Sequence, residues 1–576
     1  MNKFYLFLLV FVLLLFTCCQ AEESGKYDDI EDIISPENDK EFDKGSSIVF
    51  SELNNQLVSD LELLCRIWGF LKYHHPIVGE GKCNWDYELF RILPKYLQAR
   101  NTEERDKVIL SWIDKFGKIS VCTSCKETPS DAFIKPNLNW MENSNMNNAL
   151  KSKIREIYQN RHQGEHYYVR KQNNADFVEI INERPYNFYN PDAGFRLLAL
   201  FRFWNIIHYY FPHKHLTDMN WDDVISKYLP LFILATNRLE YEMAALQLIG
   251  ETNDSQAYFY SGDLEIQEVR GAYFAPFRVW FIEGKLVVMD YYNPELTDTT
   301  CIKIGDVITH INSEPVESII EKQKFLYPAS NKTMQLRNMS FDMLRSTQNT
   351  LNIQTEQNGQ QMIQLYYRSA LKYYGISVID KVYHLIDGNI GYARLSSINM
   401  EDIQKMKNIF ENTDGIIIDL RYFPSITNSL FFAQYFASTP TPFAKLTLPN
   451  INNPGEFTFS PTYIMPKFDE PYQGKLIVIV NEYVQYHTEY LAMNFQAGSN
   501  TTIIGSTTSG ANGNVSNFFL PGGLKTGFVS SGIYYPDGTP TQRIGIILDV
   551  WVEPTIEGIR EGKDELLEKA IRLINE

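Results

Sequence analysis

Apolar residues run without interruption through residues 476–480, near the carboxy-terminal end of the chain. Because this run is too short for a helix and is rich in β-branched residues, it predicts a strand that is buried on both faces. Residues 481–485 predict a tight turn, and the apolar positions between Tyr490 and Phe495 predict a helix after the turn. A residue at such a turn faces the free N–H groups of a helix N-terminus, the place where α/β hydrolytic enzymes present a nucleophile.

Strands and helices alternate along residues 371–576, around this segment. Residues 388–395 and 415–421 predict two further strands, and residues 401–412 predict an amphipathic helix between them. This alternation predicts an α/β core with a largely parallel sheet, in which ligands bind at the carboxyl ends of the strands.

Two copies of one helical unit precede this core. At an offset of 136 residues, Trp68 matches Trp204, and residues 84–86 match residues 220–222, both of which read Asn-Trp-Asp. In each copy a proline ends the first helix, and the Asn of Asn-Trp-Asp caps the second. The predicted divisions are helical repeat 1 at 46–130, a connector at 131–189 and helical repeat 2 at 190–263.

Residues 265–369 change to short β-rich runs. Residues 304–312, Ile-Gly-Asp-Val-Ile-Thr-His-Ile-Asn, resemble a PDZ domain. A PDZ domain captures a polypeptide end by adding it as an extra strand beside its own sheet. The resemblance implies that the peptide contacts come from Gly271, Ala272, Tyr273 and Phe274. The alternative is a β-rich insert without a binding role.

Residues 481–489, Asn-Glu-Tyr-Val-Gln-Tyr-His-Thr-Glu, resemble the nucleophile segment of the C-terminal processing peptidase and tricorn core family of serine peptidases, the tail-specific proteases. In that family a Ser stands at the place of Tyr486. The Asp-Ser-Gln-Ala segment that contains Ser255 and Gln256 resembles the family's Asp-Ser-His-Ala segment, so Gln256 occupies the place of the general base. The acidic orienting residue of the family aligns loosely with Gln542.

The oxyanion hole of the family also has a counterpart in this sequence. Residues 419–421, Asp-Leu-Arg, resemble a family segment that continues into glycines whose N–H groups form part of the hole. The positions that correspond to the hole are Pro424, which has no N–H group, Ser425, and His487 at the start of the predicted helix. A catalytic Lys of the processing-peptidase branch falls where this chain has Ala511.

The replacements at the nucleophile and base positions bear directly on function. A phenol with a pKa of about 10 is a poor substitute for a Ser hydroxyl, and an amide cannot accept and return a proton near neutral pH. The sequence therefore predicts a hydrolase scaffold that binds peptides or unfolded polypeptide ends without cutting them. The alternative is an active serine-type peptidase whose nucleophile has moved to Ser425, Ser506 or Ser509.

Composition adds limits to this interpretation. The chain has 576 residues, of which 44% are hydrophobic, so we expect a multidomain α+β protein with several cores. Its formal net charge of −17, without clusters of Lys and Arg, argues against nucleic acid as a partner. No cofactor or metal is expected. Cys122 and Cys125 predict a local disulfide or two free thiols, and a zinc site that recruits Cys65 or Cys83 is the alternative.

The amino-terminal residues predict export. A positively charged start and an apolar run at 5–16 match a signal sequence, because the run is shorter than the roughly 20 residues that span a bilayer. Residues 15–19, Leu-Phe-Thr-Cys-Cys, resemble a bacterial lipoprotein box with lipidation at Cys18. Lipidation at Cys19 and a plain cleaved signal are the alternatives. We expect a signal peptide at 1–18, an acidic tether at 19–45 and attachment to a membrane of the cell envelope.

Overall fold

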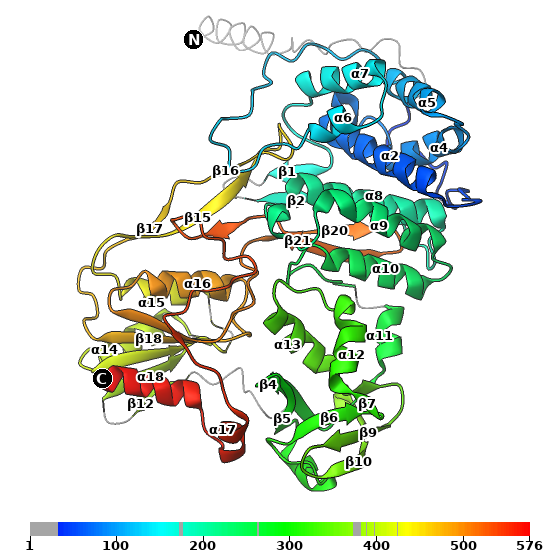
Figure 1. Cartoon of the computed structure of the whole chain (residues 1–576). Helices are drawn as coiled ribbons and strands as arrows, with labels where there is room; N and C mark the ends of the chain where they lie inside the picture. Colours follow the sequence, from blue (N-terminus) through cyan, green and yellow to red (C-terminus); the bar gives the residue numbers. More distant parts are fainter. Residues whose placement is uncertain are drawn as a thin grey trace, which may run out of the picture.

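The computed structural model describes residues 33–171, 177–261, 264–371, 382–386, 389–396, 398–422, 424 and 426–576. Helices of the amino-terminal half lie across one end of the molecule, and a β-rich region and an α/β core lie beneath them (Figure 1). The predicted signal peptide, the lipidation position Cys18 and most of the predicted tether lie outside the described residues. Within those ranges, no helix is both long enough and apolar enough to cross a membrane.

The two predicted helical copies have matching elements. The first contains α2 (Asn55–His74), α3 (Pro76–Gly79), α4 (Trp85–Leu97) and α5 (Thr102–Asp114). The second contains α8 (Ala193–Tyr210), α9 (Trp221–Leu234) and α10 (Arg238–Gly250). Between them lie α6 (Asn139–Asn143), α7 (Asn148–Gln159), β1 (Val169–Lys171) and β2 (Val178–Ile180). An Asn or Asp side chain accepts a backbone N–H at the start of each of α2, α4, α5, α8, α9 and α10, which fixes where these helices begin.

The same pair of tryptophan hydrogen bonds occurs in both copies. In the first, the indole N–H of Trp68 donates to the carbonyl of Trp85 at 3.2 Å, and that of Trp85 donates to the carbonyl of Trp68 at 3.0 Å. In the second, Trp204 and Trp221 make the same reciprocal bonds at 2.9 and 3.1 Å. The shared geometry supports the duplication predicted from the sequence.

Ion pairs link one copy to the other. Arg66 of the first copy donates to Asp222 of the second at 2.9 Å, and Arg202 of the second donates to Asp86 of the first at 2.7 Å. The two arginines are equivalent under the 136-residue offset, as are the two aspartates, so the copies exchange the same pair in both directions. Arg202 also lies 2.7 Å from Glu183 of the connector.

The β-rich region has its own core beneath the helices. Its elements are α11 (Glu265–Arg270), β3 (Tyr273–Phe274), β4 (Phe277–Ile282), β5 (Lys285–Tyr291), β6 (Val307–Ile311), β7 (Glu314–Pro315), α12 (Val316–Gln323), α13 (Lys332–Asp342), β8 (Arg345–Ser346), β9 (Thr350–Thr355), β10 (Gly359–Gln364) and β11 (Tyr366–Tyr367). The main sheet has the order β10-β9-β6-β5-β4, and β3 lies between β8 and β11 in a smaller sheet. Helix α13 packs against the edge strand β4.

The α/β core is built on one six-stranded sheet of order β12-β13-β14-β18-β19-β23. Its strands are β12 (Val382–Ile386), β13 (Ile390–Arg394), β14 (Gly415–Asp419), β18 (Lys475–Val480), β19 (Thr501–Gly505) and β23 (Val550–Trp551). Every pairing is parallel except that of β12 with β13, so the predicted largely parallel sheet is confirmed.

Helices cover both faces of this sheet. Helices α14 (Met400–Phe410), α15 (Ile426–Gln434) and α16 (His487–Gln496) contribute to the hydrophobic cluster on one face, and α18 (Glu565–Asn575) packs on the other. The remaining elements are β15 (Thr441–Pro449), β16 (Phe457–Phe459), β17 (Tyr463–Met465), β20 (Val515–Leu520), β21 (Leu524–Val529), β22 (Ile533–Tyr534) and α17 (Ile556–Glu561).

Two segments of the core reach into the helical unit. Side chains of the β20–β21 hairpin, including Phe518 and Phe528, belong to the same hydrophobic cluster as the two helical copies. At the connector, Arg161 donates to the carbonyl of Asn452, in the loop between β15 and β16, at 2.9 Å. Nearby, Cys122 and Cys125 form the predicted local disulfide, which leaves no thiol pair there for the zinc alternative.

Candidate functional site

Tyr486 occupies the turn between β18 and α16. Its backbone has φ of 58° and ψ of −130°, a left-handed conformation that costs a non-glycine residue about 1–3 kcal/mol. The Tyr486 ring contacts the ring of His487, with 3.8 Å between the ring centroids and 60° between the ring planes. Burial raises the pKa of the Tyr486 phenol, so this side chain stays protonated near neutral pH. The strained turn is therefore present, and the group that it presents is a neutral phenol.

Gln256 lies after α10, in a turn that Asp254 organises. The carboxylate of Asp254 accepts the backbone N–H of Gln256 at 2.9 Å and that of Val529 at 2.7 Å. The hydroxyl of Tyr260 donates to the Gln256 carbonyl at 2.8 Å. Gln256 lines the same cavity as Gln485, the residue before Tyr486, so the turn that contains Gln256 lies near the Tyr486 turn.

Ser255 and Gln542 meet at Ser330 of the β-rich region. The Ser255 hydroxyl accepts the backbone N–H of Ser330 at 2.8 Å and donates to the carbonyl of Ser509 at 3.3 Å. The amide nitrogen of Gln542 donates to the carbonyl of Asn253 at 3.1 Å and to the Ser330 hydroxyl at 3.4 Å. Both predicted site residues are buried, and the Ser255 hydroxyl is engaged in holding three segments together.

The predicted oxyanion positions lie at two elements. His487 is the first residue of α16, and burial lowers the pKa of its imidazole, which is neutral near pH 7. Pro424 is buried after the end of β14, and Ser425 lies outside the described residues. Beside them, Arg421 donates to Asp419 at 2.7 Å and to Asp564 at 2.7 Å, which fixes the Asp-Leu-Arg segment.

Glu489 is an organising residue that the sequence analysis did not assign, although it is the last residue of the segment with family resemblance. Its carboxylate accepts the hydroxyl of Thr508 at 2.5 Å and the backbone N–H groups of Gly510 and Ala511 at 2.8 and 3.1 Å. Complete burial raises its pKa to about 7, and these donors act in the opposite direction. Glu489 therefore ties residues 505–513, a glycine-rich loop, to α16, and the Ala511 methyl group is buried there.

The four predicted peptide contacts lie on and before β3. Gly271 has φ of 95°, and a Cβ atom there would come within 2.0 Å of the Ser346 carbonyl carbon, so the position requires glycine. Ala272 follows it, and Tyr273 and Phe274 form β3, which is paired on one side with β8 and on the other with β11. Strand addition at β3 would have to displace one of these neighbours.

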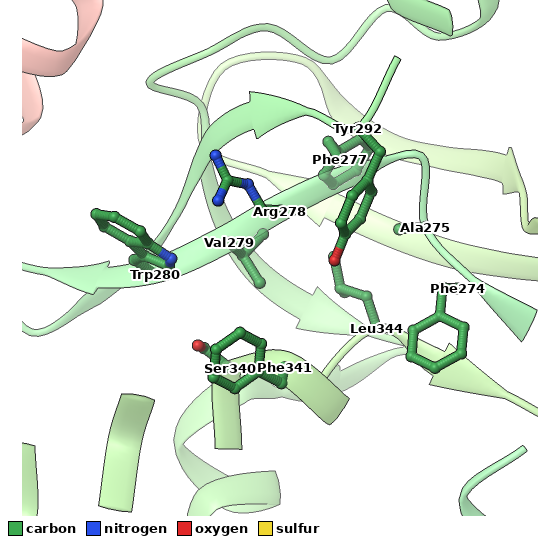
Figure 2. Close-up of a pocket in the computed structure, with 10 residues that line it drawn as sticks. All are labelled: Phe274, Ala275, Phe277, Arg278, Val279, Trp280, Tyr292, Ser340, Phe341 and Leu344. Carbon is green, nitrogen blue, oxygen red and sulfur yellow. The ribbon is translucent and has the colours of Figure 1, made fainter. Parts of the chain in front are cut away.

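A different edge of the β-rich region is unpaired. Strand β4 ends the main sheet, and no strand of the described residues pairs with its outer side. Figure 2 shows Trp280 of β4 and Phe341 of α13 among the side chains that line the narrow space beside this edge. Phe274 also lines this space, so one predicted contact residue lies where an added strand would run.

Two larger cavities lie next to the Tyr486 turn. One, of about 1170 Å³, is lined from the β-rich region by Trp280 and from the core by Asn481 and Tyr483. The other, of about 550 Å³, is lined by Gln256 and Gln485. Residues common to both linings are Tyr258, Phe341, Asp342 and Arg368. No group of three His, Cys, Asp or Glu side chains among the described residues is arranged to hold a metal ion.

Two solved structures of CPAF agree with this architecture. One is a structure of mature CPAF complexed with lactacystin, and the other is a structure of mature CPAF. Each is 13% identical to this chain, with a TM-score of 0.51. Each match covers 66% of this chain, and it covers 99% of the first CPAF chain and 98% of the second. A photosystem II D1 C-terminal processing protease is 16% identical, with 64% of this chain and 98% of that chain covered and a TM-score of 0.37.

At these identities the CPAF structures establish a shared fold. A search of curated proteins finds no match. The family model of peptidase family S41 matches residues 389–552, which contain the parallel sheet, the Tyr486 turn and the glycine-rich loop. The recognition of the C-terminal processing peptidase family is thus confirmed, and residues 389–552 form a domain of peptidase family S41.

Proposed function

We propose that this protein binds polypeptide chains, in particular their ends, without hydrolysing them. The observation that carries the proposal is the pair of side chains at the family's nucleophile and base positions. Tyr486 stands on the strained turn between β18 and α16, and Gln256 lines a cavity together with Gln485, the residue before Tyr486. Neither a protonated phenol nor an amide can carry out the proton transfers of a serine peptidase.

The other hydroxyl groups near the turn are poorly placed to replace the nucleophile. Ser509 is fully buried and donates to Glu489 at 3.3 Å, and Ser506 is 4% exposed beside Glu482. Loss of one member of a catalytic triad can lower turnover by about 10⁴- to 10⁶-fold. Replacement of two members, together with the burial of Ser506 and Ser509, supports a protein without peptidase activity.

The surfaces that would hold a chain are retained. The outer edge of β4 has backbone groups available for an added strand, which is the way PDZ domains hold a polypeptide end. The cavity of about 1170 Å³ lies between this edge and the Tyr486 turn and has an aromatic lining that includes Trp280 and Tyr483. A bound segment could therefore extend from β4 toward the former catalytic turn.

Labelling with a fluorophosphonate probe tests the absence of a reactive serine. We expect no stoichiometric labelling of the wild-type protein, no turnover of unfolded protein substrates, and no change in Ser506→Ala or Ser509→Ala. Tyr486→Ser alone should also remain inactive, because Gln256 still provides no general base. Stoichiometric labelling that one of the Ser→Ala variants abolishes would instead establish the alternative, an active peptidase with a relocated nucleophile.

We also propose that the protein is a lipoprotein of the bacterial cell envelope, anchored through Cys18. The support is the sequence of residues 1–19, in which an apolar run of signal length precedes two cysteines. Growth of an expressing bacterium with an alkyne-labelled fatty acid should label the wild-type chain and not Cys18→Ser. Labelling that Cys19→Ser abolishes and Cys18→Ser does not would contradict the assignment.

A further inference from the structure

We propose that the cavity of about 550 Å³ beside Gln256 and Gln485 recognises a carboxylate of the bound polypeptide. This inference rests on the proposed binding function and adds the chemical class of ligand. The carboxylate can belong to the chain terminus or to an Asp or Glu side chain, since both present the same group to a guanidinium.

The cavity carries an excess of positive charge. Its lining includes Arg270, Arg337, Arg345 and Arg368, and one carboxylate, that of Asp342. The whole chain has a formal net charge of −17, so this concentration of arginine is opposite in sign to the protein as a whole. A cavity lined by one sign of charge attracts ligands of the other sign.

Asp342 does not balance all of this charge. It lies 2.8 Å from Arg345 and 3.1 Å from Arg270, and it also accepts the hydroxyl of Tyr327 at 3.2 Å. Two guanidinium groups therefore share this one carboxylate, and the two remaining arginines of the lining are left to other partners.

Arg337 is held over the Tyr486 turn by neutral oxygens. Its guanidinium donates to the carbonyl of Glu482 at 2.9 Å and to the side-chain oxygen of Gln485 at 3.2 Å, and its buried Nε has no hydrogen-bond partner within the described ranges. Burial lowers the pKa of Arg337, although the carboxylate of Glu482 attracts it electrostatically. The hydrogen bonds of Arg337 to described residues all go to neutral oxygens, so a ligand carboxylate would supply a charged hydrogen-bond partner to this desolvated guanidinium.

Arg368 connects this cavity to the larger one. Its side chain is exposed, lines both cavities and lies over the Phe274 ring, 5.8 Å from the centroid. It makes no ion pair with a carboxylate in the described part of the chain. A polypeptide that extends from the β4 edge through the larger cavity would reach Arg368, which lines both cavities, before Arg337, which lines the smaller one.

Four short fluorescein-labelled peptides of common apolar sequence test the proposal. Two peptides contain Asp or Glu, and in the other two these residues are replaced by Asn or Gln. Within each pair, one peptide has a free carboxyl terminus and the other has an amidated terminus. Fluorescence anisotropy should show at least one anionic peptide binding tenfold or more tightly than the neutral amidated one, with a difference that shrinks as salt is raised. Tight binding of the acidic amidated peptide identifies side chains as the source, and that of the neutral free peptide identifies the terminus.

Equal binding of all four peptides would overturn the carboxylate proposal and leave the binding function intact, whereas absence of binding by all four would overturn both. Arg368→Gln should lower the affinity for the anionic peptides about tenfold, as expected for the loss of roughly one charge-assisted hydrogen bond. The affinity for the neutral amidated peptide should not change. Arg100→Gln removes the same charge from an exposed site in the helical unit and should change neither. Equal losses in both variants would contradict a local role of Arg368.

Discussion

Asp86 and Asp222 occupy the same place in the first turn of equivalent helices, α4 and α9, and differ in their surroundings. The Asp86 side chain is 4% exposed and bonds to the fully buried Arg202, with Lys72 3.9 Å away. The Asp222 side chain is 32% exposed and bonds to Arg66. Because the two aspartates share the same helix position, any difference in their contributions to the free energy of unfolding arises from their burial and their partners.

Asp86→Asn should therefore destabilise the protein far more than Asp222→Asn. Removal of one partner of a buried pair leaves an uncompensated charge and costs about 3–5 kcal/mol. The Arg66–Asp222 pair is partly open to solvent on the Asp222 side, so the loss of its carboxylate should cost less. Urea unfolding followed by circular dichroism would measure both changes in the free energy of unfolding. Equal losses in the two variants would show that the burial of Asp86 does not determine its contribution.

The sequence predicted the individual residues of the site unevenly. Tyr486 and Gln256 were predicted as site residues because the turn and the Asp-Ser-Gln-Ala segment have a local pattern, and in the structure Gln256 lines a cavity together with Gln485, the neighbour of Tyr486. Arg337 and Arg368 could not be assigned, because they come from the β-rich region and reach the Tyr486 turn only through packing between domains. No local spacing records that approach.

At the scale of elements, the hairpin β20–β21 joins two parts of the molecule. It follows the glycine-rich loop of the core in sequence, and its side chains Phe518, Leu520, Leu524 and Phe528 complete the hydrophobic cluster of the helical copies. The strand–turn–helix at Tyr486 and the parallel sheet were predictable from uninterrupted apolar runs. The packing of the β20–β21 hairpin against the helical copies could not be predicted, because an alternating strand pattern does not specify which surface buries its apolar face.

Phe528→Ala should destabilise the helical unit, although residue 528 belongs to the core in sequence. The side chain is fully buried, so its truncation costs about 3–5 kcal/mol. Thermal unfolding followed by tryptophan fluorescence measures the effect, because Trp68, Trp85, Trp112, Trp140, Trp204 and Trp221, six of the eight tryptophans, lie in the helical unit and its connector.

Ile353→Ala is the matched control. Ile353 is also fully buried, but it lies in the separate cluster of the β-rich region, which contains none of those six tryptophans. We expect Ile353→Ala to leave the main fluorescence transition in place. If Phe528→Ala left that transition unchanged as well, the hairpin would not be part of the helical core.

At the scale of the whole molecule, the arrangement of domains follows from which surfaces share a core. The helical unit and the α/β core share the β20–β21 hairpin, while the β-rich region has its own cluster and meets the core around Trp280, Tyr483 and Arg337. The cavities lie at that second boundary, where polar and aromatic contacts join the two sides. The hydrophobic cluster that crosses this boundary is small and contains Ile282, Val287 and Val307 of the β-rich region and Ile556 of α17. The sequence predicted helical, β-rich and α/β segments in this order, and the way in which they meet became visible only in three dimensions.

The exchanged pairs Arg66–Asp222 and Arg202–Asp86 have one more consequence. Each half of the helical unit provides the acid for the base of the other half, as two identical subunits do across a twofold axis. Separated from its counterpart, the first half would keep Asp86 and the second would keep Arg202 with no opposite charge from the other side. The helical segment therefore resembles an internal dimer, in which each half completes the charge pairing of the other beside the partners that lie in its own half or in the connector.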